Sequence, residues 1–241
     1  MTHEVNALGQ AVGFRVEGWT PPPVPPLTPM AGRTCRLEPV DVTRHAAGLH
    51  EANLLGEDGR NWAYLPYGPF ETFDAYQAWL TSVASKPDPQ FHTIVDLATG
   101  TPAGVASYLR IDPEAGSIEV GHIKYSPPLQ RTVAATEAMY LMMRRAFELG
   151  YRRYEWKCNA LNAPSRAAAQ RLGFSYEGIF RQARVDKGRN RDTAWYAMID
   201  REWPAIDRAF QRWLDPSNFD AEGRQRTSLS ALTAPILVSR G

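Results

Sequence analysis

The sequence predicts an α+β protein in which a single mixed β-sheet is flanked by helices. Three extended segments in the middle of the chain are separated by short glycine-containing turns, a spacing typical of antiparallel hairpins. They are residues 91–97, 103–111 and 117–125. On either side of this group, apolar residues recur at helical spacing instead. Grouped strands with helices before and after them indicate one sheet with helical layers.

A strand and two helices are expected before these three strands. Strand signals begin at residues 33–40, and Asp41 can then cap a helix that runs to about residue 55. Thr72 begins a second helix, in which aromatic and aliphatic residues repeat at helical spacing. Between the two helices, residues 64–70 form an aromatic loop broken by proline and glycine.

Helices and strands alternate in the second half of the chain. An apolar stripe of alanines and methionines predicts a helix that ends at Gly150. Asn162 can cap a later helix, which tolerates Pro164 in its first turn and ends before Gly173. The remaining expected elements are strands at 153–158, 174–184 and 193–199 and a final helix at 201–214.

The two ends of the chain lie outside this pattern, so we expect three regions. They are a proline-rich N-terminal arm (1–32), a folded domain (33–214) and a C-terminal tail (215–241). Residues 19–26 are expected to be polyproline II, because proline fixes φ and lacks the N–H group that a sheet needs. Apolar side chains in the arm favour packing on the body or on a second subunit. The arm and the segment after residue 215 exceed what the folded domain needs, so we expect one of them to pack at a homodimer interface.

Composition excludes several classes of protein. The chain has 241 residues, of which 44% are hydrophobic, and a formal net charge of +1. These values fit one globular core and give no sign of a nucleic-acid partner. Cys35 and Cys158 match neither a metal site nor a disulfide framework, so we expect no metal and a reducing compartment. The chain shows no signal-peptide pattern and no apolar stretch of membrane-spanning length, so we expect a cytoplasmic protein without a membrane partner.

The first chemical motif lies where the strand ending near residue 125 leads into a helix. Gln130, Val133 and Ala135 follow it in the pattern Gln-x-x-Val-x-Ala. Backbone N–H groups at a helix N-terminus, at the positive end of the helix dipole, can bind a pyrophosphate. Arg131 can add a charged donor. The alternative is an ordinary loop with a solvated arginine.

A second motif follows one strand later. Residues 159–165 read NALNAPS and residues 169–174 read AQRLGF. Together the two motifs resemble the Arg/Gln-x-x-Gly-x-Gly/Ala signature and the later Asn-x-x-Ser and Leu-Gly-Phe segments of the GNAT (GCN5-related N-acetyltransferase) superfamily. Residues 135–138 are similar to the helix start of the branch related to ribosomal-protein N-terminal acetyltransferases. Val133 departs from the family, since glycine at that position allows close backbone approach.

The resemblance implies a GNAT fold, acetyl-CoA as cosubstrate, and direct transfer of the acetyl group to a primary amine in a ternary complex. The acceptor would be a protein N-terminus or a small amine. Pantetheine would enter a gap between the strands at 117–125 and 153–158, where a free N–H polarises the thioester carbonyl. The residues implied in cosubstrate binding are Ile123, Lys124, Tyr125, Gln130, Arg131, Thr132, Val133, Ala134, Ala135, Thr136, Asn159 and Asn162.

Removal of a proton from the amine needs a base, and the resemblance points to Glu119. His122 is the rival, because its intrinsic pKa is better suited to the task. The two residues have opposite parity on a regular strand, and a bulge at Gly121 could bring them to one side. The alternative roles are a cross-strand ion pair for Glu119 and a packed histidine for His122.

The leaving thiolate also needs a proton. Many relatives carry a tyrosine at the position that Ala169 occupies here, so Ser165 or an ordered water is expected to replace it. The alternative role of Ser165 is a helix cap. Because Ala169 and Val133 depart from the family pattern, a non-catalytic acyl-CoA-binding module on the same fold is the rival function. The aromatic loop at 62–70 is either core packing or a pocket wall.

Overall fold

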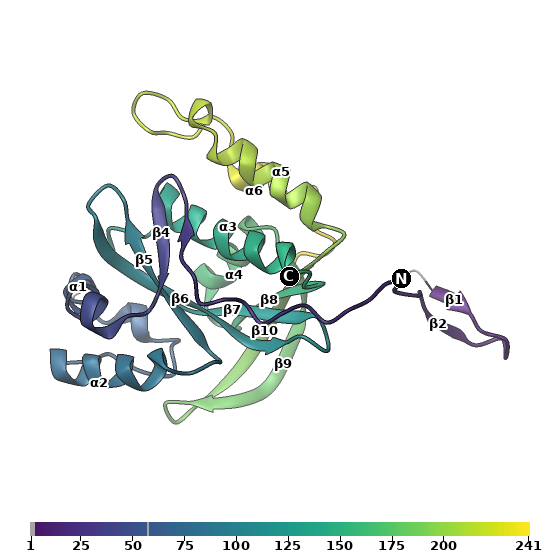
Figure 1. The fold of residues 1–241 in the computed structure, drawn as a ribbon, viewed down its shortest axis with the longest axis horizontal. Helices are drawn as coiled ribbons and strands as arrows, with labels where there is room; N and C mark the ends of the chain where they lie inside the picture. Colours follow the sequence, from purple (N-terminus) through teal and green to yellow (C-terminus); the bar gives the residue numbers. More distant parts are fainter. Residues whose placement is uncertain (1–2, 57) are drawn as a thin grey trace.

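The computed structural model describes residues 3–56 and 58–241 and shows one large mixed sheet (Figure 1). The sheet has eight strands in the order β3-β4-β5-β6-β7-β8-β10-β9, and only the β7–β8 pair is parallel. The strands are β3 Met30–Ala31, β4 Cys35–Pro39, β5 Gln90–Asp96, β6 Thr101–Asp112, β7 Ser117–Tyr125, β8 Arg153–Asn159, β9 Ser175–Asp186 and β10 Arg189–Ile199. The predicted α+β class and the antiparallel meander are confirmed.

Six α-helices are present in the described residues. They are α1 Val42–Leu54, α2 Phe73–Ala84, α3 Val133–Glu148, α4 Ala163–Arg171, α5 Trp203–Leu214 and α6 Leu229–Thr233, with 3₁₀ turns at Arg60–Trp62 and Pro216–Asn218. The expected caps form: Asp41 Oδ1 accepts from the Arg44 N–H at 3.2 Å and Thr72 Oγ1 from the Ala75 N–H at 3.2 Å. Side chains that accept these end N–H groups fix where a helix begins. Within the described residues, no helix has the length and apolar character needed to cross a membrane.

Two hydrophobic clusters cover the two faces of the sheet. The smaller cluster joins α1 and α2 to Phe91 and Val105, while the larger one includes Ile94 and Ala106. Within β5 and within β6 these pairs differ by an odd number of positions, so their side chains point to opposite faces. Helices α3 and α4 therefore lie on one side of the sheet, and α1 and α2 lie on the other (Figure 1).

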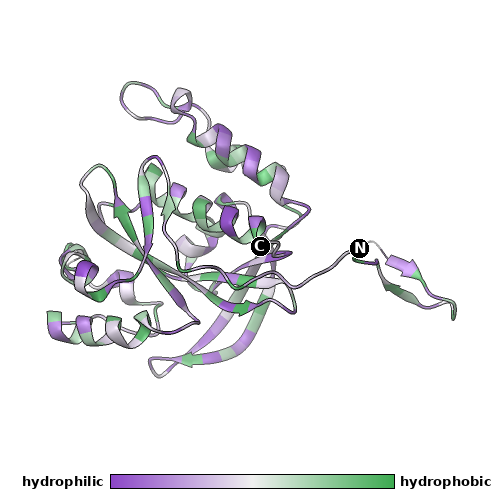
Figure 2. Cartoon of the chain, in the orientation of Figure 1, coloured by the Kyte–Doolittle hydropathy of each residue, from purple (hydrophilic) through white to green (hydrophobic). Residues whose placement is uncertain are grey.

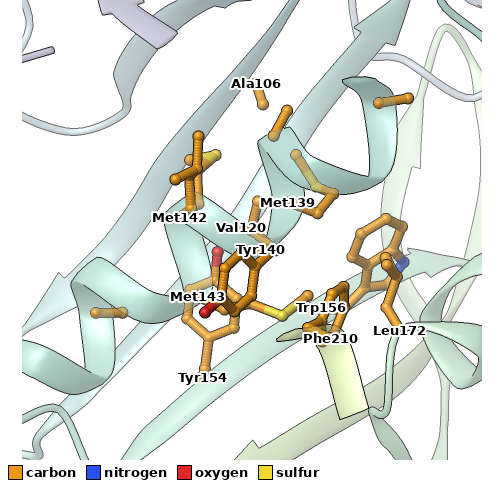
Figure 3. Packing of buried hydrophobic residues seen from close by; sticks show 14 of the residues in the cluster. Ala106, Val120, Met139, Tyr140, Met142, Met143, Tyr154, Trp156, Leu172 and Phe210 are labelled. Carbon is orange, nitrogen blue, oxygen red and sulfur yellow. The ribbon is translucent and has the colours of Figure 1, made fainter. Parts of the chain in front are cut away.

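Helix α3 is the centre of the larger cluster. Met139, Met142 and Met143 are almost fully buried, and they pack among Val120, Tyr154 and Trp156 of the sheet (Figure 3). The ribbon of α5 alternates between hydrophilic and hydrophobic residues (Figure 2), and its apolar side packs against α3. The outer helix thus shields a helix that would otherwise expose apolar surface on its far side.

Both ends of the chain are structured, with a hairpin and a short helix that the sequence did not predict and an arm that packs on the body as one of its expected alternatives. Strands β1 His3–Val5 and β2 Ala11–Gly13 form an exposed hairpin that projects from the body (Figure 1). The following arm lies on the body, where the Arg145 guanidinium donates to the carbonyl oxygens of Thr28 at 2.7 Å and Pro29 at 2.8 Å. In the C-terminal segment, Leu229 of α6 is fully buried in the main cluster.

Candidate active site

The site begins where two neighbouring strands separate. Strands β7 and β8 are paired in parallel from Ser117 with Arg153 to Val120 with Trp156, and beyond these residues the pairing stops. Strand β8 instead continues its antiparallel pairing with β10 as far as Asn159. The predicted gap between these strands is therefore present.

A cleft of about 660 Å³ lies at this separation. Its floor is formed by the ends of β7 and β8, and its walls by the loop after α1, the first turn of α4 and the β9–β10 hairpin. The lining residues used below are Arg60, Tyr64, Arg110, Glu119, His122, Ile123, Trp156, Lys157, Asn159, Asn162, Ser165, Phe180, Arg184, Arg191 and Trp195. The hairpin is tied to the loop, because Lys187 Nζ donates to the carbonyl oxygen of Trp62 at 2.9 Å.

A β-bulge shapes the floor of the cleft. Gly121 is paired with Ser107 and Lys124 with Val105, so that two residues of β7 oppose a single residue of β6. His122 has a φ of 51°, a left-handed conformation that is uncommon outside glycine. The predicted bulge is thus centred on His122 and not on Gly121. Because a bulge breaks the alternation of side chains, Glu119 and His122 both line the cleft.

Glu119 is 3% exposed and carries two ion pairs. Its Oε2 lies 2.7 Å from Arg110 Nη1 and 2.9 Å from Lys157 Nζ. Burial raises the pKa of the Glu119 carboxyl, and the two cations offset part of that rise. The ion pair considered as the alternative role of Glu119 is therefore formed, and the same carboxylate faces the cleft.

Lys157 extends this network along the floor. Its Nζ also lies 2.6 Å from Glu155 Oε2 and stands 3.8 Å above the ring of Trp195. A buried ammonium between two carboxylates and an aromatic face is held in one position. Lys157 thus fixes the orientation of the Glu119 carboxylate.

His122 is packed between aromatic rings. It is stacked on Tyr67 at a ring separation of 5.5 Å and lies 5.1 Å from Phe91, and its Nδ1 is 3.2 Å from the Tyr67 hydroxyl. Burial, followed by the charges of Arg110, Arg184 and Arg191, lowers the pKa of His122 to about 4. The imidazole is therefore neutral at neutral pH. The packed-histidine alternative describes its surroundings, although the residue also lines the cleft.

Ser165 lies in the first turn of α4, where its amide N–H donates to Asn162 Oδ1 at 3.2 Å. Asn162 is therefore the cap of this helix, as predicted. The hydroxyl of Ser165 accepts a hydrogen bond from Trp156 Nε1 at 3.0 Å. An indole N–H can only donate, so the serine proton is left free to point elsewhere.

Several residues of the predicted cosubstrate set do not line this cleft. Lys124, Tyr125 and residues 130–136 are not among its lining residues. The Lys124 side chain is buried under Trp62, with Nζ 4.6 Å from the ring, and burial lowers its pKa to about 8. The Tyr125 hydroxyl donates to the Ala135 carbonyl oxygen at 3.4 Å, so this side chain joins strand to helix.

The loop before α3 does not need glycine at position 133, because another residue of the loop takes the left-handed backbone conformation. The left-handed residue is Arg131, with a φ of 63°, and Val133 is the first residue of the helix. Thr132 Oγ1 accepts from the Ala135 N–H at 3.1 Å. The N–H groups of Val133 and Ala134 have no partner within the helix, as at any helix start. Thr136 is buried, and its hydroxyl accepts from Arg171 Nη1 at 3.2 Å.

The β9–β10 hairpin contributes residues that no sequence motif pointed to. Arg184 and Arg191 line the cleft, and so do Phe180 and Trp195, whose rings are 4.4 Å apart. The available signal was an arginine at the end of one predicted strand (174–184) and another two residues before the next predicted strand (193–199). In the aromatic loop, Tyr64 lines the cleft, whereas Trp62 and Phe70 pack edge to face at 5.6 Å. In the described residues, no group of three or more His, Cys, Asp or Glu is placed to hold a metal.

Comparison with known proteins points to one family. The acetyltransferase (GNAT) domain matches residues 35–175. A GCN5-related N-acetyltransferase from Brucella melitensis is 44% identical, with a TM-score of 0.89 over 91% of this chain and 100% of that one. A probable GNAT-family acetyltransferase from Chromobacterium violaceum is 41% identical, with a TM-score of 0.75 over 80% of this chain and 97% of that one.

A more distant structure shares the fold. It is an acetyltransferase from Salmonella typhimurium that modifies the N-terminal serine of a 50S ribosomal subunit protein. It is 22% identical, with a TM-score of 0.61 over 71% of this chain and 98% of that one. Comparison with curated proteins gives no significant match.

Proposed function

Because the chain belongs to the GNAT acetyltransferase family, we propose that it transfers an acetyl group from acetyl-CoA to a primary amine by direct attack in a ternary complex. The observation that carries this proposal is the cleft at the β7–β8 separation, which holds a buried carboxylate and a serine hydroxyl. We assign the activity to residues 33–214 and place it in the cytoplasm.

In this proposal the pantetheine arm of acetyl-CoA lies between β7 and β8. A bulge leaves backbone groups of a strand out of its ladder. An N–H near Ile123 would donate to the thioester carbonyl oxygen, where negative charge develops during attack. Asn159 and Asn162, which line the cleft from the side of β8 and α4, would contact the arm. The N–H groups of Val133 and Ala134 would bind the pyrophosphate at the start of α3.

The proton path has an acceptor and a donor. The amine nitrogen attacks the thioester carbon, a C–N bond forms, and the C–S bond breaks. Glu119 accepts the proton that the amine loses, directly or through one water. Ser165 donates a proton to the departing thiolate and takes one back from solvent, since its hydroxyl already accepts from Trp156 and its own hydrogen is free to be donated. A neutral His122 is the other candidate base.

The proposal includes two alternative classes of acceptor amine, a protein N-terminus and a small amine. A fold neighbour from Salmonella typhimurium modifies an N-terminal serine, which makes peptides a necessary part of any panel. The rival function is a non-catalytic acyl-CoA-binding module on the same fold. Acetyl-CoA supplied with a panel of peptides and small amines, followed by mass spectrometry, separates the two. An acetylated amine supports the transferase, whereas tight acetyl-CoA binding without any acetylated product supports the module.

A further inference from the structure

The wall of the cleft that the β9–β10 hairpin forms contains two arginines that are paired across its strands. Arg184 and Arg191 are direct cross-strand partners, next to a register shift between Arg191 and Thr193. Both line the cleft. Like charges placed directly opposite each other on neighbouring strands destabilise the pair. Their position therefore calls for a compensating anion.

Among the described residues, a single carboxylate forms ion pairs with these two arginines. Asp186 Oδ1 lies 2.8 Å from Arg184 Nε, and its Oδ2 lies 3.0 Å from Arg191 Nη1. Two guanidinium groups thus share one carboxylate, which leaves one positive charge in excess. The Arg191 side chain is only 12% exposed, so water compensates that charge less than it would at the surface.

Nearby carboxylates do not cancel this excess, because each already pairs with another cation. Arg110 and Lys157 share Glu119, and Lys157 has Glu155 as well. Arg60, at the loop side of the cleft, pairs with Asp58. The lowered pKa of His122, to which Arg184 and Arg191 both contribute, is consistent with a positive field in the cleft.

The arrangement also has the geometry of a carboxylate receptor. Asp186 engages the Nε of Arg184 and one terminal nitrogen of Arg191, which orients both side chains. Their other terminal N–H groups are planar donors of the kind that bind a carboxylate with two parallel hydrogen bonds. The neighbouring Phe180 and Trp195 rings provide an apolar surface for the rest of the molecule.

We propose that Arg184 and Arg191 form an anion subsite that binds a carboxylate of the acceptor amine. The proposal rests on the acetyltransferase function above and narrows its substrate class. The carboxylate belongs either to a free amino acid or to an acidic residue next to a peptide N-terminus. The two sources share the same chemistry and are separated by experiment.

The test uses full-length protein and matched acceptors. One arm compares free amino acids with their carboxamides, and the other compares peptides whose second residue is aspartate or asparagine. We expect kcat/KM to favour the carboxylate member of one arm by about 10–100-fold, the range of charge-assisted hydrogen bonds. In Arg184→Gln/Arg191→Gln this ratio should fall to about one. The single variant Arg191→Lys should keep part of the wild-type preference for the carboxylate acceptor.

Arg189→Gln is the matched control. Arg189 is exposed on the same hairpin and does not line the cleft, so this variant should keep the wild-type ratio. A wild-type ratio near one in both arms overturns the inference. A ratio that survives in the double variant also overturns it. So does a double variant that loses CoA affinity while keeping its ratio, because the arginines would then face the cosubstrate.

Binding of N-acetyl products to the CoA-loaded protein tests the subsite without turnover. By calorimetry, the carboxylate product should bind more tightly than its amide, and the double variant should lose the difference. If no amine is acetylated but this difference is found, the transferase proposal fails and the anion subsite stands. If amines are acetylated without any preference, the transferase stands and the subsite falls.

Discussion

The indole Nε1 of Trp156 donates a hydrogen bond to the Oγ of Ser165 at 3.0 Å, which joins β8 to the first turn of α4 inside the cleft. Serine is thereby held in one rotamer with its own hydrogen directed away from Trp156. This geometry suits the role proposed for Ser165, that of a proton donor to the CoA thiolate.

Ser165→Ala should lower kcat by about 10-fold, since water can take over part of a hydroxyl's role. The Kd for CoA should change little. Steady-state kinetics with calorimetry checks both values. Unchanged kcat in Ser165→Ala would assign the proton donation to solvent.

Glu119→Gln should lower kcat by at least about 10²-fold with little effect on CoA affinity, because a general base acts mainly in the transition state. A base works when deprotonated, so wild-type activity should fall as the pH drops through the raised pKa of Glu119. Glu119→Gln should lose this acidic limb. Near-normal kcat in Glu119→Gln, combined with inactive His122→Ala, would transfer the role to the histidine.

Arg110→Gln provides a second readout of the same carboxylate. Arg110 is about half exposed, and its pairing lowers the pKa of Glu119. Loss of that cation should therefore shift the acidic limb of kcat to higher pH. If kcat falls at the same pH in Arg110→Gln as in wild type, the acidic limb does not report the titration of Glu119.

Glu137→Gln should destabilise the fold by about 1–3 kcal/mol at neutral pH. The Glu137 carboxylate accepts from the backbone N–H groups of Arg33 at 2.9 Å, Thr34 at 2.6 Å and Cys35 at 3.2 Å. Although burial raises its pKa, these bonds and the Thr34 hydroxyl hold it below the ordinary value.

The sign of the pH dependence follows from that lowered pKa. The stabilisation is complete above the unfolded pKa, about 4.3, and is lost as the pH falls through the lower folded pKa. In urea unfolding, the free energy of unfolding should be higher for wild type than for Glu137→Gln. This difference should become smaller in acid. Glu148→Gln, on an exposed part of the same helix, should show little effect.

Arg131→Glu should weaken CoA binding by about 1–3 kcal/mol if its guanidinium pairs with phosphate. Its left-handed φ of 63° allows a sharper control. Arg131→Gly removes the charge at a position where glycine relieves backbone strain. The glycine variant should therefore bind CoA more weakly but melt no lower. An unchanged Kd in both variants would remove Arg131 from the cosubstrate site.

A homodimer stays a prediction. The arm from Trp19 onward is held to its own body, since Arg152 lies over the Trp19 ring at 5.4 Å. The β1–β2 hairpin has exposed apolar residues, with Leu8 82% exposed. Light scattering should show a dimer that is lost when residues 2–13 are deleted. A monomer at every concentration would contradict this prediction.

Local chemistry determined what could be predicted from the sequence. Asp41, Thr72 and Asn162 begin their helices by accepting the N–H group three residues further along the chain, so the local sequence is enough to predict them. In the same way, the short glycine-containing turns were enough to predict the hairpins of the antiparallel meander. The fold class and the gap between β7 and β8 followed from element order and from the resemblance to relatives.

Features that depend on pairing between distant segments could not be predicted. The bulge at His122 lies where the register between β6 and β7 shifts, between Val105 and Ser107. The pairing of Arg184 with Arg191 follows from the nearby turn between Asp186 and Arg189, but the place of both residues in the cleft wall depends on the pairing of β10 with β8. The burial of Leu229 in α6 requires the surface of helices placed by the rest of the fold. Each of these is decided by a partner that the local sequence does not contain.

The measurement that tests the central claim most directly is the initial rate of CoA release with acetyl-CoA and an acceptor amine varied together. Direct attack in a ternary complex predicts release that depends on the amine, an acetylated amine as product, and reciprocal plots that intersect. Parallel plots would indicate a covalent acetyl-enzyme. CoA release that is absent, or that occurs without any acetylated amine, would contradict acetyl transfer itself.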